Sequence, residues 1–267
     1  LKRADIGVAM GITGTDVAKE AADMVLTDDN FASIEAAVEE GRCIFDNLTK
    51  FIIWTLPTNL GEGLVILAAV LLGTALPILP VQILWINMTT AVLLGLMLTF
   101  EPREPGIMQR PPRQTDEPIL TATLIRRLTL VGVLMLAGAF GLYEYELDVM
   151  GASELQARTV AVNVFVMSEI FYLFNCRSLT RSFVKLGFFS NPWIFVGVSV
   201  MILLQLLFTY LPVMNLLFHS APIALESWIR ILAAATVVML VVGGEKWLVK
   251  RFAPDTGSNF ADAGAPR

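Results

Sequence analysis

Two oxygen-bearing side chains, Asn59 and Glu62, interrupt an otherwise apolar stretch of this sequence. Side chains three positions apart lie on one face of a helix, so the amide and the carboxylate could act on the same ligand. Pro57, Gly61 and Gly63 surround the pair, and such residues loosen a helix and leave backbone carbonyls free. A carboxylate in the middle of a membrane span costs about 2.5–3.5 kcal/mol on insertion scales and usually faces a bundle interior or an ion path. The segment therefore predicts the binding of a dehydrated cation.

Three further polar side chains could complete such a site. Asn87 and Thr90 are three positions apart in a second apolar stretch, and Glu169 lies near the middle of a fourth. Asn87 and Thr90 could instead only hydrogen-bond a neighbouring helix, and Glu169 could pair with Arg230. Carboxylate, amide and hydroxyl oxygens are hard ligands, which favour hard cations over copper or zinc. We predict a cation site formed by Asn59, Glu62, Asn87, Thr90 and Glu169.

The composition is that of a membrane protein with several spans. Of the 267 residues, 55% are hydrophobic and 16% are charged, and the mean hydropathy is +0.68, whereas about a quarter of the residues of a soluble domain are charged. Cys43 and Cys176 are the only cysteines; both are expected at or below the cytosolic surface, so no disulfide is expected. His219 is the single histidine, which excludes a His-rich metal site. The lipid bilayer is an expected partner, and nucleic acid is not.

Six apolar segments are long enough, or nearly so, to cross a bilayer as helices. The predicted fold class is therefore mainly α, a polytopic bundle of six transmembrane helices. The sixth segment is the least regular, because Glu226 and Arg230 lie near its start. The spans are predicted at about 51–72, 78–99, 128–145, 159–176, 193–211 and 223–243.

Basic residues between the spans predict the side of the membrane that each connection faces, because short cytosolic loops are rich in Lys and Arg. The connections after the second and fourth spans and the segment after the sixth are basic, whereas the other three connections contain only Arg158. We therefore expect an integral, multi-pass protein of the plasma membrane with both termini in the cytosol. The basic residues are Arg103, Arg110, Arg113, Arg126, Arg127, Arg177, Arg181, Lys185, Lys246, Lys250 and Arg251.

The first residues indicate water-soluble structure. Ile6–Met10 and Met24–Thr27 are predicted strands, and Asp16–Ala22 is a predicted helix. A sheet of two short strands is not stable alone, so we expect the chain to begin within a cytosolic α/β domain of a longer protein. On this division, residues 1–45 are the end of that domain with a linking helix, residues 46–250 form the transmembrane domain, and residues 251–267 are a disordered tail.

The approach to the first span is also helical. Apolar residues recur at helical spacing from Phe31 to Lys50 without a proline, which predicts a helix. One helix could continue into the membrane as far as Leu72, roughly 60 Å at about 1.5 Å per residue; the alternative is a bend before a separate span. The Glu101–Pro118 connection contains five prolines, which favour extended chain that either packs against the soluble domain or acts as a spacer.

Residues 1–31, LKRADIGVAMGITGTDVAKEAADMVLTDDNF, resemble the end of the phosphorylation domain of P-type cation-transporting ATPases. The resemblance continues through Val38–Arg42 to about Arg251, and it is to the branch that contains the sarcoplasmic-reticulum calcium pump, the sodium–potassium pump and bacterial relatives. It implies that the six spans are the last six of ten, and that the long first helix joins the phosphorylation domain to the ion sites. It further implies that the ligand motif Asn59–Glu62, with Asn87, Thr90 and Glu169, corresponds to cation ligands of the calcium pump.

Two features depart from the pattern of that family. Calcium pumps have an aspartate directly after the residue that matches Thr90, and this chain has Ala91; because Ca²⁺ takes about 6–8 oxygens, two full calcium sites are not expected. The phosphorylated aspartate, the magnesium motif and the nucleotide domain are absent from these 267 residues. In the family, ATP phosphorylates that aspartate and the covalent intermediate drives transport. ATP and Mg²⁺ would therefore act only through the missing N-terminal part of the same pump, and the chain alone is expected to be inactive.

The resemblance implies the C-terminal transport half of an ATP-driven cation pump, with Ca²⁺ as the first choice of ion and sodium, protons or another hard cation as alternatives. A self-contained six-span channel or secondary transporter is one competing function, and a non-transporting membrane assembly fragment is another. The incomplete α/β start argues against a self-contained transporter. An upstream reading frame that encodes an Asp-Lys-Thr-Gly motif would decide for the pump.

Overall fold

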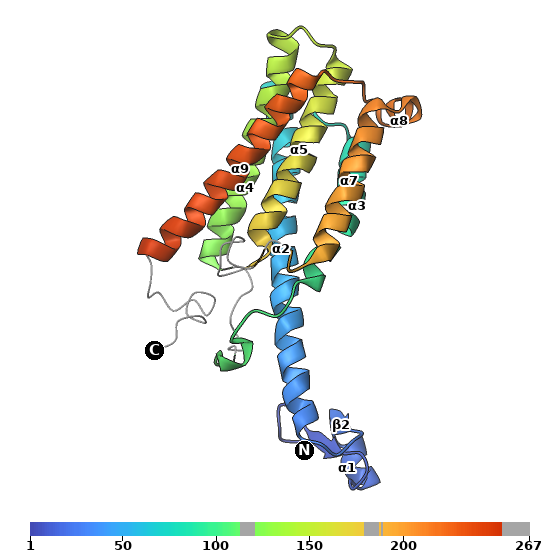
Figure 1. The fold of residues 1–267 in the computed structure, drawn as a ribbon, viewed down its shortest axis with the longest axis vertical. Coiled ribbons are helices and arrows are strands. Elements are labelled where there is room, and N and C mark those ends of the chain that lie inside the picture. Colours follow the sequence, from blue (N-terminus) through green and yellow to red (C-terminus); the bar gives the residue numbers. More distant parts are fainter. Residues whose placement is uncertain (113–120, 179–186, 188, 253–267) are drawn as a thin grey trace.

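The computed structural model describes residues 1–112, 121–178, 187 and 189–252. A bundle of long helices forms most of it, and a small α/β unit lies beyond one end of the bundle (Figure 1). In that unit, β1 (Val8–Met10) and β2 (Met24–Leu26) are parallel neighbours, and α1 (Asp16–Glu20) lies between them in the sequence. The predicted order of strand, helix and strand is therefore confirmed.

Two aspartates hold the segment that follows β2. Asp29 accepts hydrogen bonds from the backbone N–H groups of Ile12 and Thr13 and from the Thr13 hydroxyl, and Asp28 accepts one from the Ser33 hydroxyl. The bond from the Thr13 hydroxyl, followed by that from the Ile12 N–H, holds the pKa of the Asp29 carboxyl below its usual value. These bonds fix the α/β unit to the start of the long helix that follows.

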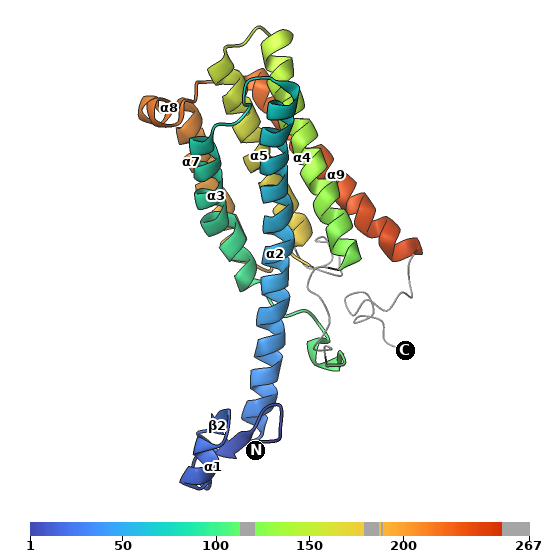
Figure 2. The same ribbon diagram turned by 180° about the vertical axis from the view of Figure 1, so that it is seen from behind.

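Six helices among the described residues are long and apolar enough to cross a membrane, as predicted. The central helix, α5, is buried along nearly its whole length, and the others lie around it (Figures 1 and 2). A short helix, α8 (Pro212–Phe218), follows the fifth span. The six are α2 (Ala32–Leu72), α3 (Pro80–Thr90) with its continuation to Phe100, α4 (Ala122–Asp148), α5 (Glu154–Cys176), α7 (Pro192–Tyr210) and α9 (Leu225–Phe252).

The helix α2 runs without a break from the α/β unit through the bundle (Figure 2). Its 41 residues confirm the expected continuous helix, and the alternative of a bend before a separate span is wrong. Gly73 ends the helix in the left-handed conformation, with a φ angle of 68°. At about 1.5 Å per residue α2 is roughly 60 Å long, so it connects the α/β unit to the middle of the bundle.

The second span changes its type of helix half-way. After α3 come a π-helical segment, η1 (Ala91–Gly95), and a 3-10 segment, η2 (Leu96–Phe100). A Cβ atom at Gly95 would lie 2.6 Å from the Phe51 ring and 3.0 Å from the Trp54 ring, so only glycine fits where η1 approaches α2. The apolar pattern over 78–99 contains no signal for this change. Segments of π-helix often occur at functional sites.

The connection after η2 runs back along α2. Arg42 donates hydrogen bonds to the carbonyls of Ile107 and Arg110 at 2.8 and 2.9 Å, and Arg110 forms an ion pair with Asp46 at 2.8 Å. Ile107 is buried in a short 3-10 turn, η3 (Ile107–Gln109). This part of the proline-rich connection therefore packs against the linking helix and is more than a spacer.

Some sequence-based expectations fall outside the described residues. They concern Arg113 and Pro118 in the first basic connection, Arg181 and Lys185 in the second, and positions 253–267 of the predicted tail. Arg251 and Phe252, at the start of the predicted tail, belong to α9.

Candidate cation-binding site

Glu62 of α2 and Asn87 of α3 meet inside the bundle. The Asn87 amide donates a hydrogen bond to Glu62 Oε2 at 2.7 Å and another to the Ile83 carbonyl at 3.2 Å. Only 4% of Glu62 is exposed, and its Oε1 has no hydrogen-bond partner among the described residues. A buried carboxyl oxygen without a partner is costly, so this atom is suited to a positively charged ligand or to a proton.

Glu169 of α5 faces the same region. It is 1% exposed, and its Oε2 also has no hydrogen-bond partner in the described part of the chain. Its carboxyl group interacts with the Thr90 side chain and lies close enough to Glu62 for the two charges to interact. The Trp54 indole donates a hydrogen bond to the backbone carbonyl of Glu169 at 3.1 Å. This bond holds the Glu169 turn of α5 against α2.

The alternative pairing of Glu169 with Arg230 is wrong. Arg230 forms an ion pair with Glu146 of α4 at 2.7 Å. Arg230 lies in the second turn of α9 and Glu146 in the last turn of α4, so both are at one end of the bundle, whereas Glu169 lies past the middle of α5. Arg230 therefore pairs with Glu146, because Glu146 lies at the same level of the bundle and Glu169 does not.

Asn59 is exposed, unlike the other predicted ligands. Three residues advance a helix by about 300°, so Asn59 and Glu62 differ in direction by about 60°. That difference allows Glu62 to point into the bundle while Asn59 stays at its surface. The structure thus brings together Glu62, Asn87, Thr90 and Glu169, and it leaves Asn59 outside this group.

Ala91 is the first residue of η1 and is half-buried. Its N–H group still bonds the Asn87 carbonyl as in an α-helix, so Ala91 and Asn87 lie on one face. No group of three or more His, Cys, Asp or Glu residues within the described ranges is placed to hold a metal ion. The site therefore offers two carboxylates together with amide and hydroxyl oxygens, which is a hard-ligand set of moderate charge.

Tyr172 is a supporting residue that sequence reasoning missed. Pro57 lies inside α2 and lacks the N–H group that would bond the carbonyl of Ile53. The Tyr172 hydroxyl donates a hydrogen bond to that carbonyl at 2.9 Å. A proline in a buried span is itself a signal that some neighbouring helix must supply a donor. Tyr172 and Trp54 together fix α2 to α5 beside the two glutamates.

Replacing Tyr172 by phenylalanine should destabilise the protein by about 1–3 kcal/mol, because a buried carbonyl then loses its donor. Replacing Pro57 by alanine in the same protein should recover much of that loss, since the new N–H group can bond Ile53 as in a regular helix. Thermal unfolding in detergent of the parent, the two single variants and the double variant measures this coupling. Strictly additive losses would show that the two residues are not linked through Ile53.

Comparison with known proteins relates the sequence of this chain to cation-transporting ATPases. The family described as "Cation transporting ATPase, C-terminus" matches residues 75–248. A probable cation-transporting ATPase F of Mycobacterium tuberculosis is 63% identical over 248 residues, which are 93% of this chain and 27% of that protein. The cation-transporting ATPase pma1 of Synechocystis is 45% identical over 236 residues, or 85% of this chain and 26% of that protein.

A calcium-transporting ATPase of Bacillus subtilis is also similar. It is 37% identical over an alignment of 248 residues that covers 91% of this chain and 27% of that protein. The chain thus spans only about a quarter of the length of these relatives.

Proposed function

This chain belongs to the cation-transporting ATPase family, of which it contains the C-terminal membrane part, and we propose that its helices hold the transported cation of an ATP-driven pump. The proposed ligands are Glu62, Asn87, Thr90 and Glu169. Asn59 is a further ligand if a part of the pump outside this chain covers its face of α2.

The observation that carries this proposal is the pair of buried glutamates. Glu62 Oε1 and Glu169 Oε2 lie without hydrogen-bond partners among the described residues, on helices that face each other. Two carboxylates that interact in a dry interior repel each other, and each loses its hydration. A cation between them would offset both costs, and protons would do so when the cation leaves.

We propose Ca²⁺ as the transported ion. The hard oxygens of the site suit it, and the Bacillus subtilis relative is named a calcium-transporting ATPase. Because Ala91 contributes no oxygen ligand through its side chain, we propose one tight divalent site. ATP and Mg²⁺ would act on the part of the pump outside this chain, and α2 would transmit the resulting movement to the site.

The test of this function is phosphorylation of the intact pump by ATP in the presence of different cations. Micromolar Ca²⁺ should support formation of the acid-stable phosphoenzyme if phosphorylation depends on a cation bound by Glu62 and Glu169. Magnesium alone and sodium with magnesium are the controls. Phosphorylation that responds to no hard cation would contradict the proposal.

We also propose that the protein lies in the plasma membrane with both termini and both basic connections in the cytosol. Ion pairs bring several of the basic residues to one end of the bundle, since Arg110 bonds α2, Arg177 bonds Glu101, and Arg127 bonds Glu245 of α9 at 2.8 Å. The positive-inside rule assigns this end to the cytosol.

Single cysteines should therefore react differently with an impermeant thiol reagent added to intact cells. Cysteines at Met150 and Leu216, which are 42% and 78% exposed, should be labelled from outside. A cysteine at the exposed Gln109 should be labelled only after the membrane is opened. Cys43 and Cys176 are buried and can be replaced by serine to remove background. Labelling of Gln109→Cys in intact cells would reverse the topology.

A further inference from the structure

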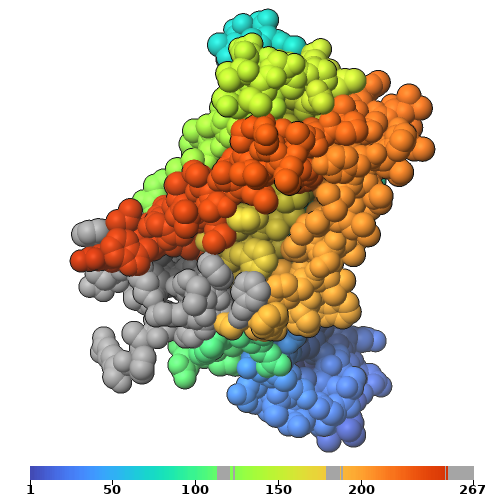
Figure 3. Space-filling view, turned by 45° about the horizontal axis from the view of Figure 1, so that its top comes forward, coloured from blue at the N-terminus to red at the C-terminus, as the bar shows by residue number. Residues whose placement is uncertain are grey.

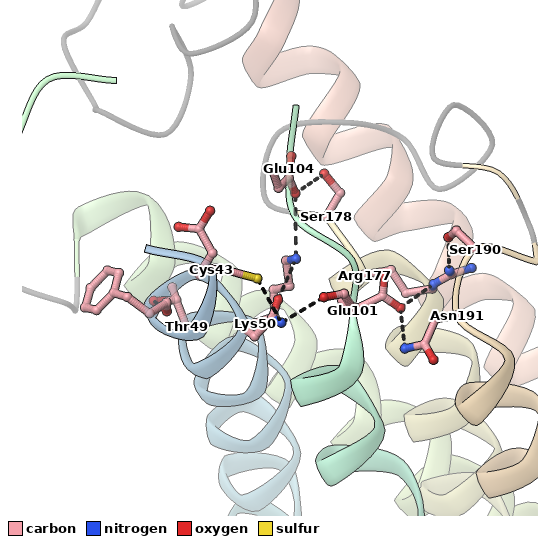
Figure 4. Close-up of polar contacts among 12 residues, drawn as sticks. Cys43, Thr49, Lys50, Glu101, Glu104, Arg177, Ser178, Ser190 and Asn191 are labelled. Atoms are coloured by element: carbon pink, nitrogen blue, oxygen red, sulfur yellow. Dashed lines mark hydrogen bonds and ion pairs between the residues drawn. The ribbon is translucent and has the colours of Figure 1, made fainter. Parts of the chain in front are cut away.

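Side chains from neighbouring segments enclose the end of the second span that follows η2 (Figure 4). This end is Glu101, which directly follows η2 and is 3% exposed. Arg177, next to the end of α5, and Asn191, before the start of α7, are 0% and 1% exposed. Glu101, Arg177 and Asn191 are called the Glu101 clamp below.

The last backbone carbonyls of the second span accept hydrogen bonds from amide side chains of neighbouring segments. A helix leaves its final carbonyls without partners inside the helix. Asn191 donates to the Met97 carbonyl at 2.9 Å, and Asn47 of α2 donates to the carbonyls of Thr99 and Glu101 at 3.1 and 2.9 Å. The end of the irregular span is therefore fixed by amides from α2 and from the start of α7.

The Glu101 side chain adds a buried ion pair. Its Oε1 accepts a hydrogen bond from Arg177 Nε at 2.9 Å and another from Asn191 at 3.0 Å. Arg177 also donates to the Ser190 hydroxyl at 2.7 Å. The exposed fraction of both charged side chains is 0%. Such a pair adds little net stability, because desolvation offsets the attraction, but removing one partner leaves an uncompensated charge. The geometry of the pair is thus its main contribution.

Lys50 of α2 orients the Asn47 amide, which bonds the last carbonyls of the second span. Its ammonium group donates to Asn47 Oδ1 at 2.9 Å, so the Asn47 NH₂ group points at the carbonyls of the second span. Lys50 also forms an ion pair with Glu104 at 3.9 Å and is close enough to Glu101 for their charges to interact. The clamp is therefore continuous with the linking helix.

Two polar contacts connect the second span with α5 and with Arg177 directly after it, one at each end of the irregular segment. Thr90 interacts with Glu169 before η1, and Glu101 pairs with Arg177 after η2. Between them lie only π-helical and 3-10 turns, which are less regular than an α-helix and whose geometry depends on their anchors. The second contact is therefore one of the anchors that hold the second span in place along α5.

We propose that Glu101 and Arg177 are positioning residues for the cation site, acting through the register of the second span against α5. This inference rests on the proposed function, since it assigns the clamp a task in forming that site. Neither residue touches the cation. Breaking the pair lets the irregular segment shift, so that the Thr90 oxygen moves away from Glu169 and the affinity for the cation falls.

The test uses the intact pump with Glu101→Gln, Arg177→Lys, Arg177→Met and the double variant Glu101→Gln/Arg177→Met. A second Glu–Arg pair, in which Glu146 is buried and Arg230 is partly exposed, joins α4 to α9 and serves as the control. Its variants are Glu146→Gln and Glu146→Gln/Arg230→Met. For each protein, the thermal unfolding midpoint and the Ca²⁺ concentration for half-maximal phosphoenzyme formation are measured, together with Glu62→Gln as the reference for a lost ligand.

Glu101→Gln and Arg177→Met each break the ion pair. Each should raise the Ca²⁺ concentration for half-maximal phosphoenzyme formation by about tenfold, within the range that residues away from a ligand can reach. The double variant should have a higher unfolding midpoint than the single variants, because neither charge is left unpaired. It should not recover the Ca²⁺ affinity, because the register of the second span against α5 is not restored. The control pair should change stability alone. Clamp variants that lose stability with unchanged affinity, or control variants that lose affinity equally, would overturn the proposal. A parent pump that ignores Ca²⁺ would instead contradict the proposed function, and the clamp with it.

Discussion

Replacing Glu62 by glutamine in the intact pump should weaken its apparent affinity for the transported cation by on the order of 100-fold, which is about 2.7 kcal/mol. The substitution keeps the size of the side chain and its contact with Asn87, but it removes a negative charge from a site that is 4% exposed. Attraction to a divalent ion is strong there because little water screens it. The measurement is the Ca²⁺ dependence of phosphoenzyme formation.

Three companion variants separate a ligand effect from a structural one. Glu169→Gln should cause a loss of the same order, because Glu169 is equally buried and also has an oxygen without a partner in the described residues. Asn59→Ala should have a smaller effect, since Asn59 lies at the surface of this part of the pump. Glu146→Gln makes the same chemical change where Arg230 already pairs the carboxylate. Unchanged affinity in both the Glu62 and Glu169 variants would reduce these residues to a structural role.

Replacing Ala91 by aspartate should add a second tightly bound Ca²⁺ ion or raise the affinity for Ca²⁺ by about tenfold or more. An added carboxylate supplies charge and oxygens that Ca²⁺ prefers. Ala91 is half-buried and lies on the same face of the second span as Asn87. The new side chain would therefore lie on the face from which Asn87 bonds Glu62. Equilibrium binding of radioactive calcium to the purified pump and its variant measures the change.

Ala91→Asn is the matched control, because it adds a side chain of the same size without the charge. If it reproduces the gain, the charge is not responsible for it. If Ala91→Asp lowers affinity, the new carboxylate has taken up a proton or disturbed η1, as an unpaired buried acid does. Two Ca²⁺ ions bound by the unmodified pump would show that Ala91 does not limit the number of sites.

The six spans and the long linking helix could be predicted from the sequence because a helix in a membrane satisfies its own backbone hydrogen bonds. Length and hydropathy are local properties, and they located all six spans within the described residues. The apolar spacing from Phe31 onward likewise predicted the helix that leads into the first span, whereas the structure decided that it continues without a bend. Glu62 and Glu169 could also be identified from the sequence, because a carboxylate in an apolar stretch is costly and usually functional.

The partners of these side chains could not be predicted in the same way. In a soluble helix the apolar face shows which side is buried, but both the lipid-facing and the buried faces of a membrane helix are apolar. The rotation of each helix about its axis, and its displacement along its neighbours, are therefore not encoded in the hydropathy pattern. The rotation of α2 about its axis places Asn59 at the surface and Glu62 inside the bundle. The position of Arg230 along α9 brings it to Glu146 and not to Glu169.

The irregular half of the second span is the clearest case of a feature that only tertiary structure decided. The residues of η1 and η2 are apolar apart from Thr99 and include no proline, so local preference would continue α3 as a regular helix. Close packing of Gly95 against Phe51, and the bonds of Glu101 to Arg177 and Asn191, come from residues far away in the sequence. The sequence alone thus determined which helices cross the membrane and which acids they carry, whereas contacts between helices decided which atoms meet, because only packing determines rotation and register.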